Sequence, residues 1–199
     1  GASSSFTVTE DTTAPTAPSI TSVTDSVAPI TGSLTSGAST NDTDLTVKVS
    51  LVGTGAVAGD TIQLYDGSGT GSPLGTYTLL AADITNTFAN VQTGTLTDGT
   101  TYAITARVTD AAGNQSGASS SFTVTEDTTA PIVSGLSINE TGLTFTASDN
   151  ASLSYDSPFA SVGTVNNGSL TTLTAIQQSS LLQGALQVTD GANSTLVGV

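Results

Sequence analysis

The sequence predicts an all-β protein built of tandem β-sandwich modules, and three observations predict it. Charged residues make up only 9% of the 199 residues, and the other polar residues are mainly Thr, Ser, Asn and Gly, which suit strands and tight turns better than helices. Apolar and polar residues alternate along several segments, as in half-buried strands. The segment GASSSFTVTEDTTAP occupies residues 1–15 and returns unchanged at residues 117–131, which indicates tandem repeats.

The repeat divides the chain into three parts. Residues 1–10 are predicted to be the last strand of a preceding repeat, residues 11–126 a complete module, and residues 127–199 a shorter, atypical or truncated module. The last part is expected to hold fewer than the seven strands of a full sandwich, because its span from Asp127 to Asp190 is much shorter than the matching span from Asp11 to Asp110. Residues 3–9 have no sheet of their own and are predicted to fill an open sheet edge of another chain.

Seven strands are expected in the complete module. The alternation is clearest where Leu45, Val47 and Val49 face one way, and again where Ile104 and Val108 do. Seven short strands in about 100 residues indicate an immunoglobulin-like sandwich. The expected ranges are 20–24, 45–51, 62–65, 74–79, 88–93, 102–108 and 122–125.

A tyrosine corner is predicted in the segment LTDGTTY. Leu96, Asp98 and Gly99 form the turn, and Tyr102 begins the sixth strand. In this motif the Tyr hydroxyl bonds to the backbone a few residues upstream and ties the strand to the preceding loop. The alternative is an ordinary strand Tyr; the corner is favoured because the strand count agrees. Leu182 stands at the matching position of the last module, so no corner is expected there.

The composition excludes most enzyme chemistries and several kinds of partner. The chain has no His and no Cys, which rules out zinc sites and His- or Cys-dependent nucleophilic triads. The net charge is -14, and Lys48 and Arg107 are the only basic residues, so neither nucleic acid nor an anionic membrane surface is an expected partner. No apolar run is long enough for a membrane-spanning helix.

Several segments carry a family resemblance. VTDAAGN at residues 108–114, the Ser-rich turn after it and the following FTVTEDTTAP resemble the junction between bacterial Ig-like tandem repeats in large secreted adhesins of the repeats-in-toxin type. STNDT at 39–43 and GDTIQLYD at 59–66 resemble early strands of that family. The resemblance implies a secreted or bacterial cell-surface location, a spacer role in cell adhesion or biofilm formation, and neighbouring repeats as partners. It also implies a host-cell or biofilm ligand bound through other domains, and Ca²⁺ bound where modules meet.

Topology predicts which residues would bind the calcium. In an immunoglobulin-like sandwich, the loops after the second and sixth strands lie beside the incoming linker. Carboxylates that converge without a basic neighbour repel one another, and Ca²⁺ takes six to eight oxygen ligands. The predicted ligands are Glu10, Asp11, Asp60, Asp110 and Asn114 at the first linker, and Glu126, Asp127, Asp149 and Asp190, with Asn150 and Asn193 beside them, at the second.

Other acidic residues have simpler interpretations. Asp66 and Asp98 stand in turns and are expected simply to cap backbone groups, which is the common use of Asp in loops. The segment from Asp66 is not an EF-hand, because Tyr77 stands where the bidentate Glu is required.

Three functions remain open. The leading one is a structural extender without catalytic activity. The second is a glycan- or protein-binding module carried mainly by residues 127–199, although that part offers only Phe145, Tyr155 and Phe159 as aromatic residues. A hydrolase that uses two carboxylates is ranked last, because no pair of acids is recognisable as its catalytic pair.

Overall fold

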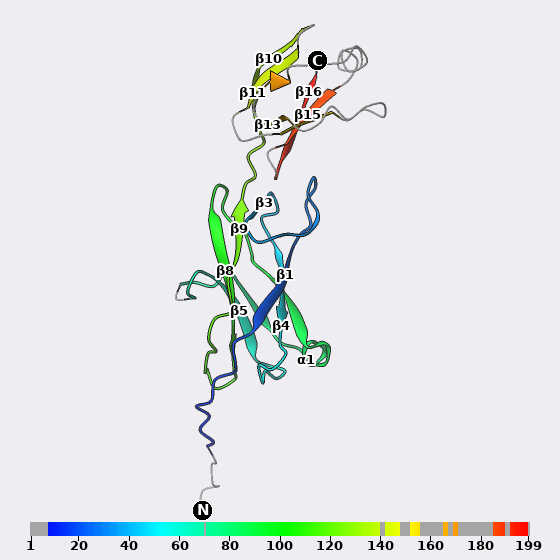
Figure 1. Ribbon diagram of the computed structural model, residues 1–199. Coiled ribbons are helices and arrows are strands. Elements are labelled where there is room, and N and C mark those ends of the chain that lie inside the picture. The colour runs from blue at the N-terminus through cyan, green and yellow to red at the C-terminus, as the bar shows by residue number, and fades with distance from the viewer. Residues whose placement is uncertain are drawn as a thin grey trace, which may run out of the picture.

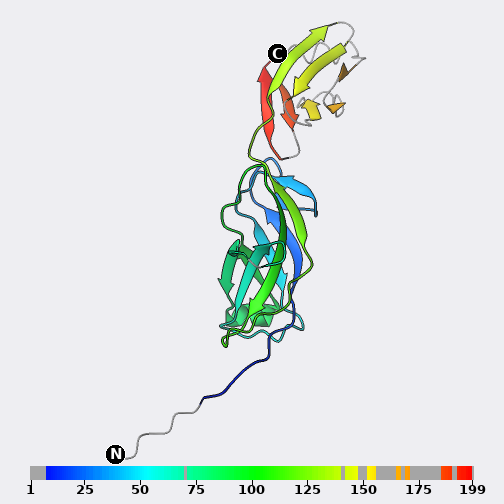
Figure 2. The same cartoon turned by 90° about the vertical axis from the view of Figure 1, so that its left-hand side faces the viewer.

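The computed structural model describes residues 8–69, 71–139, 142–147, 152–155, 165–166, 169–170, 185–189 and 192–198. A compact body spans residues 19–126, and a second group of strands lies beyond one end of it (Figure 1). The N-terminal segment leaves from the opposite end, as the rotated view also shows (Figure 2). Within the described residues, no helix has the length and apolar character needed to cross a membrane.

Two packed sheets form the body. The first contains, in spatial order, β2 (Gly32–Ser33), β1 (Ser19–Asp25), β4 (Thr46–Ser50) and β7 (Phe88–Gln92). The second contains β3 (Ala38–Thr40), β9 (Phe122–Glu126), β8 (Thr101–Thr109), β5 (Thr61–Asp66) and β6 (Gly75–Thr78). All neighbouring strands are antiparallel except β3 and β9, which are parallel. This is an immunoglobulin-like β-sandwich, and the seven predicted strands of the module are confirmed; the short strands β2 and β3 were missed.

The core follows the alternation seen in the sequence. On β4, Val47 and Val49 have no exposed surface, and on β8 the same holds for Ile104 and Val108. On β4 the intervening residues Thr46, Lys48 and Ser50 are only partly buried, so this strand buries one face. On β8, Thr105 is buried as well, so this strand is covered on both faces near Ile104. The two inner faces meet in one cluster, whose other fully buried members include Val23, Leu45, Ile62, Leu64, Ala106 and Val124.

A short helix, α1 (Ala81–Asn86), joins β6 to β7 and was not predicted. Asp83 in its first turn accepts a hydrogen bond from the Leu80 N–H at 2.8 Å and one from the Tyr77 hydroxyl at 3.1 Å. Thr87 ends the helix in the left-handed conformation, with φ 62°. Local side-chain caps therefore hold a helix that is too short to be stable alone.

The tyrosine corner is confirmed. The Tyr102 hydroxyl accepts a hydrogen bond from the Thr97 N–H at 2.9 Å, across the turn that joins β7 to β8. Gly99 has φ +71° in this turn, and its N–H donates to the Glu126 carbonyl at the end of β9. The corner therefore fixes the loop beside the point where the chain leaves the module.

We expect Tyr102→Phe to lower the free energy of unfolding by about 1–3 kcal/mol, because it leaves the Thr97 N–H without its acceptor beside a buried ring. Urea denaturation followed by circular dichroism measures the loss. Tyr77→Phe is the control, since its hydroxyl bonds to the exposed helix turn instead. Equal losses in the two variants would contradict a special role for the corner.

The second group of strands also forms two sheets. One contains β10 (Val133–Asn139), β11 (Gly142–Ala147) and β14 (Ser169–Leu170). The other contains β13 (Val165–Asn166), β12 (Ser152–Tyr155), β15 (Ala185–Thr189) and β16 (Ser194–Gly198). Seven strands are thus described where fewer were expected, and β13 and β14 have two residues each. The predicted donor strand, residues 3–9, lies mostly outside the described residues.

Candidate cation sites at the two ends of the module

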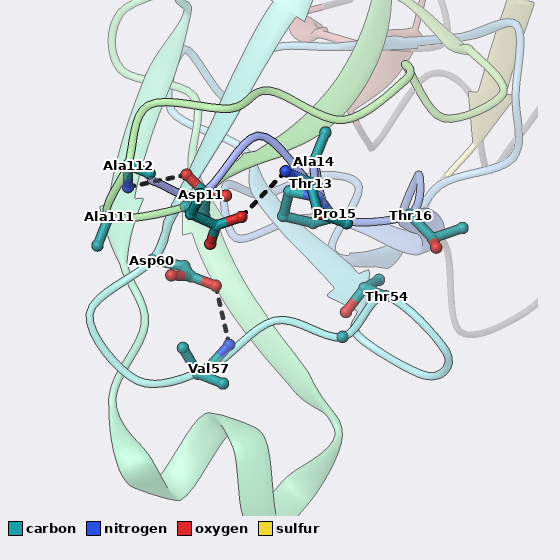
Figure 3. Close-up of a pocket in the computed structure, with 12 residues that line it drawn as sticks. Asp11, Thr13, Ala14, Pro15, Thr16, Thr54, Val57, Asp60, Ala111 and Ala112 are labelled. Atoms are coloured by element: carbon teal, nitrogen blue, oxygen red, sulfur yellow. Dashed lines mark hydrogen bonds between the residues drawn. The ribbon is translucent and has the colours of Figure 1, made fainter. Parts of the chain in front are cut away.

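The entrance end is where the first linker joins the sandwich. Asp11 of the linker, Asp60 before β5 and Asp110 after β8 all line one pocket of about 450 Å³, together with Pro15 and Val57 (Figure 3). Three carboxylates predicted from topology to share this end therefore do share it. Glu10 is exposed on the linker and does not line the pocket.

Each of the three entrance carboxylates accepts a hydrogen bond from a backbone N–H group. Asp11 Oδ1 accepts from the Thr13 N–H at 3.0 Å, and Asp60 Oδ2 accepts from the Val57 N–H at 2.9 Å. Asp110 Oδ1 accepts from the N–H of Ala112 at 2.9 Å. These are the loop-capping bonds of an ordinary Asp, so each entrance carboxylate already has a hydrogen-bond donor without a cation.

Asn114 links the last loop of the module to the linker. Its Nδ2 donates to Asp110 Oδ2 at 2.9 Å and to the Asp11 carbonyl at 3.0 Å. The hydrogen bond from the Asn114 side chain is the largest cause that holds the pKa of Asp110 below its ordinary value; burial acts in the opposite direction. The amide of Asn114 therefore acts as a donor here, and only its oxygen remains as a ligand for a cation.

The exit end is where β9 leads into the second linker. Asp25 ends β1, Glu126 ends β9, and Asp42 follows the end of β3 after one residue. These three residues, the exit-end acids, are exposed by only 1%, 0% and 4% respectively. Three acidic side chains are thus buried where three strands end.

Asp25 and Asp42 have hydrogen-bond partners. Asp25 accepts from the Val27 N–H at 2.7 Å and from the Thr40 hydroxyl at 2.6 Å. Asp42 accepts from both the N–H and the hydroxyl of Ser26, at 2.6 Å and 2.8 Å. Both carboxylates therefore lie inside the exit end with oxygens that accept from neighbouring N–H and hydroxyl groups.

Glu126 has no such partner. Both of its carboxylate oxygens are buried without a hydrogen bond. Its pKa is raised from 4.5 to about 7, chiefly by burial and then by the negative charges of Asp42, Asp98, Asp25 and Asp127. A buried carboxylate without a donor is costly, because neither water nor protein replaces its hydration.

The burial of Glu126 comes from the fold and not from its local sequence. Glu10 stands in the same segment, SFTVTEDTTAP, and is exposed. The N–H of Glu126, by contrast, donates to the Thr100 carbonyl, and its own carbonyl accepts from Gly99. Glu10 and Glu126 therefore share one local sequence, but Glu10 is exposed and Glu126 is buried.

The two basic side chains of the chain are engaged elsewhere. Lys48 Nζ lies 3.8 Å from the centroid of the Phe88 ring. Arg107 donates to the carbonyls of Ser116 and Ser68, at 2.7 Å and 2.8 Å. The described residues therefore supply no positive charge that compensates the exit-end acids.

Two predicted ligands of the second linker, Asp149 and Asp190, lie outside the described residues. Asp127 adjoins the exit-end acids, and its N–H donates to the Thr40 carbonyl at 2.8 Å. In the part of the chain that the structure describes, no three acidic side chains are grouped tightly enough to hold a metal ion as they stand. The assignment of calcium ligands therefore stays a prediction.

The sequence interpretation missed Asp25 and Asp42. Asp25 directly follows the predicted strand 20–24, and Asp42 lies in the quoted segment STNDT, so the available signal was an acid just after each strand that ends at the exit. Asp66 and Asp98 do cap backbone groups, but groups that lie far along the chain. Asp98 accepts from the Thr128 N–H at 2.7 Å in the second linker, and Asp66 accepts from the Ala103 N–H at 2.8 Å on β8.

Comparisons with known proteins identify no family for this chain. A scan against protein-family models and a search of curated proteins each return no match. Among solved structures, the chain is similar to the human OSCAR ligand-binding domain, with 14% identity over 94% of this chain and 96% of that chain and a TM-score of 0.37. It is also similar to an I-band fragment of titin, with 13% identity over 93% of this chain and 64% of that chain and a TM-score of 0.37. The immunoglobulin-like assignment rests on the sheet order and the tyrosine corner.

Proposed function

We propose that this chain is part of a structural extender in a large adhesin that is secreted to, or displayed on, a bacterial surface. Its modules would hold a distal binding region away from the cell, in support of adhesion or biofilm formation, and Ca²⁺ at the module junctions would stiffen the array. The partners are neighbouring repeats of the same chain, with a surface ligand bound by other domains. No catalytic role is proposed.

The observation that carries the calcium part of the proposal is Glu126. A carboxylate with two buried, unpartnered oxygens at a module junction lacks a positive group, and the chain has no basic residue there. The acids at this end repel one another, since the negative charges of Asp42, Asp98, Asp25 and Asp127 all help to raise the pKa of Glu126. Either a proton or a cation removes that repulsion.

The donor chemistry fits calcium. Carboxylate, hydroxyl and carbonyl oxygens are hard ligands, and Ca²⁺ accepts them in loose geometry, whereas Mg²⁺ keeps several of its waters. The residues that would hold it are the exit-end acids Asp25, Asp42 and Glu126, with Asp127 of the linker beside them. Because Asp25 and Asp42 belong to the module body, a shared cation would tie the start of the linker to that body.

The entrance pocket is the weaker candidate. Asp11, Asp60 and Asp110 line it together, but backbone N–H groups already donate to all three carboxylates. In a longer array, Glu10 would end the last strand of the preceding module and occupy the position that Glu126 has here. We therefore place the stronger site at the exit of each module, next to the entrance of the following one.

We expect calcium to raise the melting temperature of the chain relative to chelator at matched ionic strength. A ligand that binds only the folded state stabilises it by about 2.7 kcal/mol at 100 times its Kd. Glu126→Gln should lose the calcium-dependent rise, whereas Glu10→Gln, in the same local sequence but exposed, should keep it. Differential scanning calorimetry gives the melting temperatures.

Two results would contradict this proposal. One is a native chain whose melting curve is the same with calcium and with chelator. The other is a Glu126→Gln chain that keeps the full calcium response, which would move the site away from the exit-end acids. A calcium response lost in Asp60→Asn but kept in Glu126→Gln would assign the ion to the entrance pocket instead.

A further inference from the structure

The second linker is held from the side of the preceding module by Asp98. The Asp98 carboxylate accepts from the Thr128 N–H at 2.7 Å and from the Thr129 hydroxyl at 2.9 Å. The bond from Thr128 is the main reason that the pKa of Asp98 lies below its ordinary value. One exposed side chain on the tyrosine-corner turn thus binds two consecutive linker residues as a charged acceptor.

The same linker is held from the side of the following module by Asn193. Its Nδ2 donates to the Asp127 carbonyl at 2.7 Å and approaches the Thr129 carbonyl at 3.3 Å. Asn193 is 6% exposed, and it precedes β16 in the last described loop of that module. A buried amide that loses its partner is costly, so this contact constrains the linker strongly.

The first linker is bound in the same way by the module that follows it. Asn114 donates to the Asp11 carbonyl at 3.0 Å, as Asn193 does to the Asp127 carbonyl. The Thr13 N–H donates to Asp11 Oδ1 at 3.0 Å, and the Thr129 N–H donates to Asp127 Oδ1 at 3.1 Å. The two linkers therefore share the same Asn contact and the same Asp turn.

We propose that the module at residues 11–126 holds its incoming and outgoing linkers each through one side chain, and that these contacts, with that of Asn193 in the following part of the chain, set the alignment of neighbouring modules in the absence of any cation. An Asn in the loop before the last strand, Asn114 or Asn193, fixes the incoming linker. An Asp on the tyrosine-corner turn, Asp98, fixes the outgoing linker. This goes beyond the proposed function, because calcium would then reinforce an alignment that the protein already has.

The linker is short enough for these contacts to be decisive. Between Glu126 at the end of β9 and Pro131 there are four residues, and Pro131 is buried and has a fixed φ. Asp98 and Asn193 act on three of those four residues from opposite modules. Their bonds therefore leave little freedom for one module to turn against the other.

The test compares the orientation of the two modules in the full chain, in chelator, by residual dipolar couplings. The native chain should give one alignment tensor for both modules. Asp98→Ala and Asn193→Ala should each give two different tensors, and Asp98→Ala should reduce amide-exchange protection at Thr128 about tenfold, as loss of a charge-assisted bond predicts. Thr129→Val removes only the hydroxyl that donates to Asp98. It should make the two tensors differ less than Asp98→Ala does, and it changes no residue within either module.

Two control variants distinguish the loss of contacts at the second linker from a general loss of stability. Asp66→Ala removes a turn Asp that bonds within its own module. Asn114→Ala removes the side-chain contact to the first linker and leaves the contacts of the second linker in place. Both should keep the single tensor. Two independent tensors in the native chain, or one tensor in both Asp98→Ala and Asn193→Ala, would overturn the proposal.

Calcium distinguishes this proposal from the previous one. A native chain that is flexible in chelator and aligned in calcium would overturn the cation-free alignment and support the calcium site. A native chain that is aligned in both, with no calcium response in melting temperature, would support the Asp and Asn contacts and overturn the calcium site.

Discussion

Gly75→Ala is expected to destabilise the sandwich by roughly 3 kcal/mol or more, the upper range for forcing an atom into a packed site. A Cβ at Gly75 would lie 1.9 Å from the Gln92 carbonyl oxygen and 3.0 Å from its carbon. These are backbone atoms of β7, so no side chain can move aside to make room. The expected result is a large fall in the urea midpoint, or failure to fold.

The cause is the way in which the two sheets meet at one side. β6 is the edge of one sheet and β7 the edge of the other, and the two strands are in contact there. Gly71→Ala in the same hairpin is the control, because its Cβ would meet nothing within 4 Å. If the two variants unfold at the same urea concentration, close packing of β6 on β7 is not needed for stability.

Gly75 also illustrates what the sequence could and could not predict about the fold. The strand at 74–79 was predicted from its alternation, and alternation also located the buried faces around Val47 and Ile104. Alternation reports which face of a strand is buried, but not which other strand comes close to it. The contact of Gly75 with Gln92 joins two sheets, so no local pattern contains it.

The residues of the candidate sites also fall into those that the sequence could predict and those that it could not. Topology brought Asp11, Asp60 and Asp110 to one end, because the order of strands decides which loops are neighbours. It did not reveal Asp25 and Asp42, which gather with Glu126 only because β3 pairs in parallel with β9, and β3 was too short to be predicted. Asp98 was expected to cap backbone groups and does, but which groups was not predictable, because its partners lie about 30 residues further along the chain.

In chelator, we expect the stability of the module to fall as the pH rises from about 4.5 to about 7, by up to about 3 kcal/mol from Glu126 alone. The pKa of Glu126 is raised in the folded protein, so between these values the folded state binds a proton that the unfolded state has released. Stability therefore decreases as pH rises, opposite to the effect of an ordinary paired carboxylate.

Glu126→Gln isolates this contribution from the other acids that face the site, Asp25, Asp42, Asp98 and Asp127, because they remain in both proteins. The variant should equal the native chain near pH 4.5 and exceed its stability above pH 7, where the native carboxylate is charged and unpartnered. Urea denaturation across this range gives the difference in stability. The ¹³C shift of the Glu126 carboxyl reports its titration directly, with exposed Glu10 as the internal reference.

A difference in stability between the two proteins that does not change with pH would show that the pKa of Glu126 is not raised in the folded protein. Calcium above its Kd should reverse the order at pH 8, since the native chain would then gain a ligand that the Gln variant cannot hold.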